Sequence, residues 1–266
     1  MNARTRAGTG RPTPHHPPTA LLRLLVRQVR AENRAFWRNP AAAFFTFAFP
    51  LVFMVILNLV FASSGGDGAV RFYTPAIVAF SIVNAGFTTL AMSITIARDE
   101  GILKRVRGTP LPAGVYLLAR VVHSACTGLL LAAIVALFGA LAFGVPLPLE
   151  RLPLLLVVLL VGAATFCALG LAVCGFIPSA SAAPAVVNAI ALPLLFISNT
   201  FVRIETGVLV TIGSLFPIRP FADSLQALWD PVRAGAFDPT AILFVAAWGI
   251  AGIVVAARTF TWEPRA

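Results

Sequence analysis

The segment 98–112 contains closely spaced acidic and basic residues that could form ionic contacts. It gathers acidic and basic side chains within a few positions, with a long apolar run on each side. Asp99 is a residue type that begins helices, and Glu100 precedes Lys104 by four residues, the favourable order for a helical ion pair. The proline after Thr109 then ends the helix. The pattern predicts a short charged helix between two apolar runs, and one interpretation is an anchor that holds positive charge at a membrane surface.

The composition indicates that most of the surface of this protein faces lipid. Only 11% of its 266 residues are charged, against about 25% in an ordinary soluble domain. Hydrophobic residues make up 59% of the chain, and the mean hydropathy is +0.90. A soluble globular domain and a disordered chain are both excluded. The net charge of +10 comes from basic residues that lie between apolar runs and form no stripe among aromatics, so we expect no nucleic acid as a partner.

Five arginines mark an amphipathic helix before the first apolar run. Steps of three or four residues place them on one face of a helix over 20–39: Arg23, Arg27, Arg30, Arg34 and Arg38. Leucine, valine and phenylalanine occupy most of the other face. This pattern predicts a helix in the membrane interface, with its arginines at the phosphate headgroups, and a solvated helix is the alternative. Residues 1–19, rich in proline and arginine, are predicted to form a disordered cytoplasmic tail.

Six apolar runs are long enough to cross a bilayer, which takes about 20 helical residues. The predicted spans are 41–62, 73–97, 115–143, 152–177, 184–202 and 240–257. We therefore expect an all-α polytopic membrane protein whose transmembrane domain covers 40–266. With the N-terminus inside, fourteen Lys and Arg residues fall in cytoplasmic segments and five fall outside. Because cytoplasmic loops carry the excess of basic residues, both termini are predicted to face the cytoplasm.

The predicted spans contain no Asp, Glu or Lys, and most of their polar groups are expected to join helices by hydrogen bonds. Five of these groups are candidates to line a pathway: Asn84, Thr88, Asn188, Ser198 and Asn199. Three cysteines and His123 lack the spacing of a metal or catalytic site, so packing is predicted for them. The only lysine, Lys104, does not follow a glycine as a Walker A loop requires. The chain is predicted to be non-catalytic, with no metal or cofactor of its own.

Several short motifs in the charged loop and the next span occur in a particular order: Glu100-Gly101, Leu103-Lys104-Arg105, Arg107, Thr109-Pro110-Leu111, Tyr116 and Arg120. Arg38-Asn39-Pro40 stands before the first span, and 193–199, Phe216-Pro217, Phe221 and Leu225 stand before the last. Together they resemble the signature of the ABC type-2 permeases, the membrane subunits of drug- and lipid-exporting ABC transporters, with daunorubicin-resistance-type exporters the most similar. The resemblance covers the chain from about residue 20 to its end.

The resemblance implies an ATP-driven exporter that moves a drug, an antibiotic or a lipid-like cargo out of the cytoplasm or inner leaflet, across a bacterial plasma membrane. The charged loop would be a coupling helix that docks on a separate ATP-binding subunit, and that subunit would bind ATP and Mg. The contacts would come from these residues, supported by the interfacial helix: Asp99, Glu100, Lys104, Arg105 and Arg107. A second permease copy or a related permease would complete the pathway, and 203–238 would form re-entrant or interfacial helices at the outer leaflet.

Two other classes of protein remain open. An ion-coupled secondary transporter or a channel keeps ionisable groups or a filter inside its spans. An intramembrane enzyme needs a nucleophile with an acidic partner, whereas His123 is the only histidine near a predicted span. Copurification of an ATPase would favour the exporter, and transport driven by an ion gradient alone would favour the secondary transporter.

Overall fold

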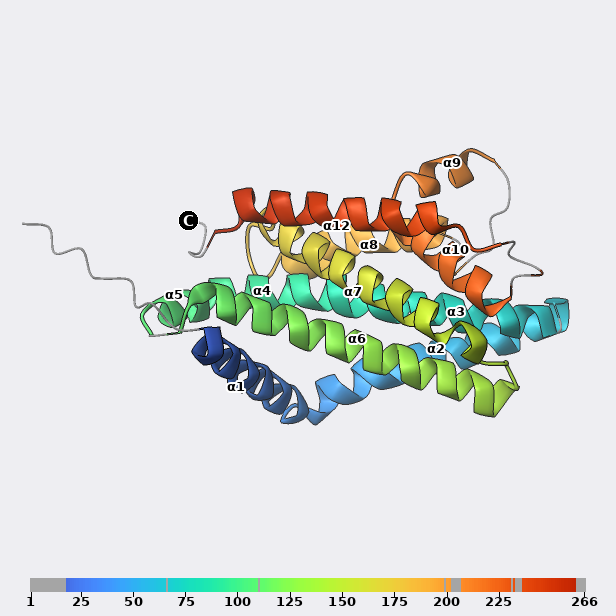
Figure 1. Ribbon diagram of the computed structural model, residues 1–266, viewed down its shortest axis with the longest axis horizontal. Coiled ribbons are helices and arrows are strands. Elements are labelled where there is room, and N and C mark those ends of the chain that lie inside the picture. Colours follow the sequence, from blue (N-terminus) through green and yellow to red (C-terminus); the bar gives the residue numbers. More distant parts are fainter. Residues whose placement is uncertain are drawn as a thin grey trace, which may run out of the picture.

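The computed structural model describes residues 18–65, 67–109, 111–198, 200–201, 207–230, 232 and 236–261. Every regular element in these residues is a helix, and the long helices run side by side along the long axis of the molecule (Figure 1). The predicted all-α fold is thereby confirmed. The predicted tail lies outside the described residues, apart from its last two positions, which begin the first helix.

The elements follow in this order: α1 (Pro18–Trp37), α2 (Pro40–Gly65), α3 (Asp67–Val83), the π-helical segment η1 (Asn84–Thr89), α4 (Leu90–Asp99), α5 (Ile102–Arg107), α6 (Ala113–Phe143), the short 3₁₀ turn η2 (Leu149–Arg151), α7 (Leu152–Cys174), α8 (Ala183–Ile197), α9 (Val208–Ser214), α10 (Ile218–Trp229) and α12 (Pro239–Thr259). Proline opens α2 and α12, where its missing N–H costs no helical hydrogen bond. Asp238 caps α12, and hydrogen bonds from the Thr240 side chain and backbone lower the pKa of this carboxyl.

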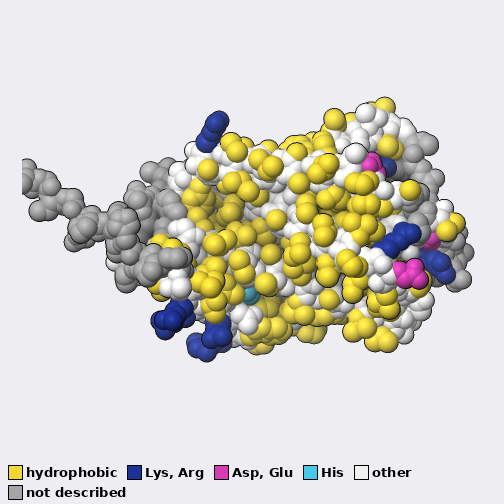
Figure 2. Space-filling model, viewed as in Figure 1, with side chains coloured by type: hydrophobic (Ala, Val, Ile, Leu, Met, Phe, Trp, Pro, Cys, Tyr) yellow, Lys and Arg dark blue, Asp and Glu magenta, His cyan; other side chains and the backbone are white. Residues whose placement is uncertain are grey.

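Five helical runs in the described residues are long and apolar enough to cross a bilayer: Pro40–Val60, Arg71–Asp99, Gly114–Phe143, Leu149–Cys174 and Pro239–Thr259. They coincide with five of the six predicted spans, and α9 with α10 adds a sixth if this bent pair counts as one span. Figure 2 shows hydrophobic side chains over the middle of the molecule and charged side chains gathered toward its two ends. This distribution matches a bundle whose middle lies in lipid.

The predicted fifth span, 184–202, is longer than the helix that forms there. α8 has 15 residues and ends at Ile197, so it is about 22 Å long, while the hydrocarbon core of a bilayer is about 30 Å thick. Its last carbonyl accepts a hydrogen bond from Arg219 Nη1 of α10 at 3.4 Å instead of one from a further helical turn. The end of α8 is therefore in contact with a distant helix.

The two short helices predicted before the last span are confirmed, and they meet at an angle of 95°. At their bend, Phe216 stacks on Trp248 of α12 with ring centroids 6.1 Å apart. Phe221 is fully buried and packs edge-on against Phe166 of α7 at 5.4 Å. It also lies against Gly162, ten residues after the start of α7 and therefore about 15 Å into the bundle. The bend and α10 therefore reach about half the depth of the bundle, while α9 is exposed along most of its length.

α7 is the central helix, in contact with α12, η1, α4 and α6. Glycines on α12 allow a close approach, because a Cβ on Gly249 would lie 2.7 Å from Thr165 Oγ1 of α7. Thr165 in turn donates a hydrogen bond to the Val245 carbonyl at 3.1 Å. Close packing and interhelical hydrogen bonds hold helices together in lipid, where burial of apolar surface supplies little net force.

Candidate functional site

α5 is a six-residue helix fixed to the end of the bundle by one buried leucine. Leu103 has no exposed surface and packs with Ala97 of α4 and Tyr116 of α6. Gly101 adopts a positive φ of 70°, which lets the chain turn between α4 and α5. The prediction that Asp99 begins this helix is wrong, because Asp99 is the last residue of α4 and Gly101 stands at the N-cap of α5. The glycine turn displaces the start of the helix by two residues.

The charged side chains of this segment divide into two groups. Glu100, Lys104 and Arg105 are exposed. Glu100 caps the end of α4, so it and Lys104 are not four residues apart within one helix, as the sequence suggested. Arg107 belongs to α5, but its side chain lies outside the described part of the structure. The exposed charges at this end of the bundle can meet another protein.

Arg98 and Asp99 face inward and bind the turn between α7 and α8. The Arg98 side chain is 2% exposed and donates to the carbonyl of Cys174 at 3.0 Å and to that of Ile177 at 2.6 Å. Asp99 Oδ2 accepts from the backbone N–H of Ala180 at 2.5 Å, and its Oδ1 lies 3.7 Å from Arg98 Nε. These bonds join the end of α4, and α5 with it, to the α7–α8 turn. Asp99, predicted to contact a partner, is thus engaged within the chain.

α1 packs on α6 and leaves its arginines exposed. All five predicted arginines are exposed: Arg23, Arg27, Arg30, Arg34 and Arg38. On the packed face, Glu32 Oε2 lies 3.4 Å from Arg120 Nε of α6, and Gln28 Nε2 donates to Glu32 Oε1 at 2.9 Å. The Arg120 guanidinium lies over the Tyr116 ring at 5.3 Å. Because Tyr116 also supports α5, this chain of contacts connects α1 to α5.

Four of the five predicted pathway residues are described by the structure, two on η1 and two on α8 and its C-cap. Asn84 and Thr88 are half-buried on η1, and Asn188 is half-buried on α8. Ser198 is fully buried, and its hydroxyl donates to the carbonyl four residues earlier. Asn199 lies outside the described residues. π-Helical segments within longer helices often occur at functional sites. η1 is such a segment, so it indicates a functional site at the depth of Asn84 and Thr88 independently of their polar side chains.

A polar cavity of about 410 Å³ lies between α1, α2, α6 and the junction of η1 with α4, and we call it the α1–α6 cavity. Its polar lining includes Glu32, Asn39, Thr89, Ser93, Arg120 and Thr127. A second hollow of about 270 Å³ adjoins it, because Phe36, His123 and Thr127 line both. The sequence did not predict this site, since Glu32 belongs to α1 and its position among five arginines suggested no pairing with a distant span.

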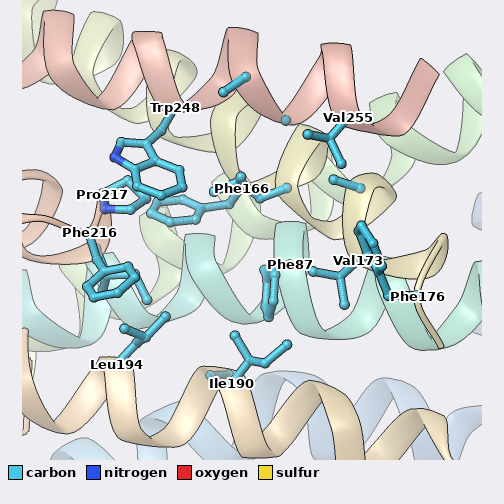
Figure 3. Close-up of a pocket in the computed structure, with 16 residues that line it drawn as sticks. Phe87, Phe166, Val173, Phe176, Ile190, Leu194, Phe216, Pro217, Trp248 and Val255 are labelled. Carbon is cyan, nitrogen blue, oxygen red and sulfur yellow. The ribbon is translucent and has the colours of Figure 1, made fainter. Parts of the chain in front are cut away.

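A separate cavity of about 250 Å³ lies at membrane depth and is lined only by apolar residues and glycine. We call it the apolar cavity. Figure 3 shows side chains around it from η1, α7, α8, α12 and the bend between α9 and α10, among them Phe87, Phe166, Leu194 and Trp248. The described residues contain no group of three His, Cys, Asp or Glu side chains that could hold a metal ion. The buried thiols of Cys167 and Cys174 point to backbone carbonyls of neighbouring helices, as packing residues do.

Comparison with known proteins agrees with this architecture. The ABC-2 type transporter family matches residues 23–228, which includes α5, α9 and nearly all of α10. A putative transport permease of Bacillus subtilis (strain 168), YvfS, is 24% identical over 220 residues, which are 81% of this chain and 88% of the relative. The family match includes the exposed charges of α5 and the lining of the α1–α6 cavity, and it ends before α12, which lines part of the apolar cavity. The chain therefore belongs to the ABC-2 type transporter family.

Proposed function

We propose that this chain is the membrane subunit of an ABC exporter of a bacterial plasma membrane, driven by a separate cytoplasmic subunit that binds ATP and Mg. The observation that carries the proposal is the construction of α5. Its exposed Lys104 and Arg105 stand on a helix that Leu103 anchors in the bundle. Through Arg98 the same segment is tied to the α7–α8 turn. A displacement of α5 would therefore be transmitted to α4, α7 and α8 through these contacts.

The energy for transport comes from another chain in this proposal. The one lysine of the sequence, Lys104, follows Leu103, so the sequence given contains no Walker A loop. The exposed residues Glu100, Lys104 and Arg105 are proposed to contact the ATP-binding subunit, with Arg107 beside them on α5. Asp99 would act indirectly, by holding the segment in place. α1 supports the same region through Glu32 and its contact with α6.

The cargo is proposed to be hydrophobic or amphipathic, such as a drug, an antibiotic or a lipid-like molecule. Both cavities lie at the depth of the spans, and one of them is lined by apolar residues and glycine alone. A second permease copy or a related permease would complete the pathway. α2 supports such pairing, because its apolar spanning stretch is only 22% buried within this chain and exposes Phe44, Phe45 and Leu59.

Reversing two exposed charges tests the docking role of α5. In Lys104→Glu with Arg105→Glu, we expect recovery of the copurified ATP-binding subunit to fall at least about tenfold, because charges of one sign would meet in the interface. Thermal unfolding of the permease should stay unchanged, since both side chains are exposed. Glu100→Ala should reduce transport in proteoliposomes with less effect on assembly. A proline at Leu103 is a poorer test, because it also removes the buried anchor.

Arg258→Glu is the matched control, an exposed basic residue in the last turn of α12 at the same end of the bundle. It should copurify the ATPase as the unmodified chain does. Normal assembly and ATP-dependent transport by the double variant and by Glu100→Ala would overturn the docking assignment. Transport that follows an ion gradient with no ATPase present would favour the secondary-transporter alternative.

A further inference from the structure

The α1–α6 cavity spans the headgroup level and the upper acyl chains of one leaflet. Arg120 lies seven residues after the start of α6, about 10 Å into that helix, and Ser93 lies six residues before the end of α4, about 9 Å in. Thr127, at the deep end, is about 21 Å along α6. Half of the hydrocarbon core is about 15 Å thick. The exposed arginines of α1 at the shallow end place the cavity in the cytoplasmic leaflet by the positive-inside rule.

A partly accessible ion pair stands at the headgroup end of this cavity. Glu32 and Arg120 are 13% and 18% exposed, and both line the cavity. Their closest approach, 3.4 Å between Oε2 and Nε, is an ion pair without a well-formed hydrogen bond. Among the described residues, Arg120 makes one long hydrogen bond, to the Ser93 carbonyl at 3.5 Å. A guanidinium has several further N–H groups, so both members of the pair can still bind a ligand.

The opposite charges of Glu32 and Arg120 determine which lipid headgroup can bind beside them. A purely anionic headgroup near Arg120 would be repelled by Glu32, and a purely cationic one near Glu32 would be repelled by Arg120. A zwitterion can satisfy both, with its ammonium on the carboxylate and its phosphate on the guanidinium. Beside the pair, rings of Phe36, Trp37 and Phe47 cluster with centroids 5.4 to 6.1 Å apart and line the adjoining hollow. Trp37 combines an apolar ring with an N–H group and suits the boundary between headgroups and acyl chains, while the two phenylalanine rings suit the acyl chains.

We propose that the α1–α6 cavity binds the headgroup of a zwitterionic phospholipid of the cytoplasmic leaflet, its ammonium at Glu32 and its phosphate at Arg120. The exposed residues Asn39 and Ala42 stand at the rim, where the chain passes from α1 to α2. The inference goes beyond the proposed function and needs neither ATP nor the ATP-binding subunit. Failure of lipid binding would leave the docking role of α5 untouched, and failure of docking would leave this site untouched.

Lipid retention by the purified chain tests the site. The detergent-solubilised protein is mixed with equal amounts of phosphatidylethanolamine and phosphatidylglycerol of the same acyl chains, and bound lipid is counted by native mass spectrometry. We expect phosphatidylethanolamine to be retained with about tenfold preference, the effect of a charge-assisted hydrogen bond. Glu32→Gln should abolish the preference, and Arg120→Gln should reduce retention of both lipids. Glu150→Gln, an exposed acid in η2 at the other end of the bundle, is the matched control and should retain the preference.

A charge exchange separates ligand binding from the structural role of the pair. Glu32→Arg with Arg120→Glu keeps an ion pair between α1 and α6, so the thermal stability lost in Glu32→Gln should return. The preference for phosphatidylethanolamine should not return, because the order of phosphate and ammonium along the headgroup is fixed. Equal retention of the two lipids by the unmodified chain would overturn the proposal. A full preference in Glu32→Gln or in the exchanged variant would overturn it as well.

Discussion

Arg98→Met should lower the free energy of unfolding by about 3 kcal/mol, the cost of removing one member of a buried charged network. The arginine is 2% exposed and its two hydrogen bonds reach carbonyls at the end of α7 and beyond it. Methionine fills much of the same space but donates nothing. The carbonyls of Cys174 and Ile177 would lose a charged donor, and Asp99 would lose its nearest cation. Denaturation of the purified chain in detergent, followed by helical circular dichroism, measures the loss.

The same variant should also uncouple ATP hydrolysis from transport in the assembled complex. With Arg98 gone, α5 remains on Leu103 and can still dock, but its link to the α7–α8 turn is lost. ATPase activity should therefore persist while transport in proteoliposomes falls. Arg98→Lys should be intermediate, because an ammonium keeps the charge but cannot reproduce the planar fork that reaches two carbonyls. Arg258→Met, at an exposed arginine, is the control. An unfolding free energy of Arg98→Met equal to that of the control would contradict the role assigned to this side chain.

The sequence predicted the elements of this fold well wherever local pattern decides them. Length and hydropathy predicted six spans, five of which coincide with helical runs long enough to cross a bilayer, and the steps between arginines predicted the amphipathic α1. The short helices α9 and α10 were expected from the family resemblance and not from a local pattern. The predicted span was extended to residue 202 across the polar residues 198–200, so the length of α8 was overestimated. The helix ends at Ile197, whose carbonyl accepts a hydrogen bond from Arg219 of α10. No local pattern contains that contact.

The candidate site was predicted in part, for a related reason. The charged segment and its short helix follow from local sequence, and Lys104 and Arg105 are exposed as a docking role requires. The inward roles of Arg98 and Asp99 depend on a turn 76 to 81 residues away along the chain, which periodicity cannot bring near. Glu32 was missed for the same reason, since its partner Arg120 lies on another helix. Buried charges of this kind are found only once helices are placed side by side.

A single added methyl group at Gly170 should destabilise the bundle by about 2 kcal/mol, as overpacking does in a well-packed core. An alanine Cβ there would lie 2.7 Å from the carbonyl oxygen of Gly86 and 3.0 Å from that of Phe87. Both atoms belong to the backbone of η1, so no side chain can rotate to relieve the contact. α7 and η1 would have to separate, and Phe87 lines the apolar cavity that the two helices share with α8 and α12. Gly170→Ala should therefore lower both the unfolding temperature and the transport rate.

Gly114→Ala is the matched control for this change. Gly114 lies in the first turn of α6, and a Cβ there meets nothing within 4 Å. Since alanine favours a helix over glycine by roughly 1 kcal/mol, the control should unfold at the same temperature as the unmodified chain or slightly above it. The two variants differ in where the methyl group points and share the same gain in helix propensity. If Gly170→Ala matched Gly114→Ala in stability, the overpacking of Gly170 against the backbone of η1 would be contradicted.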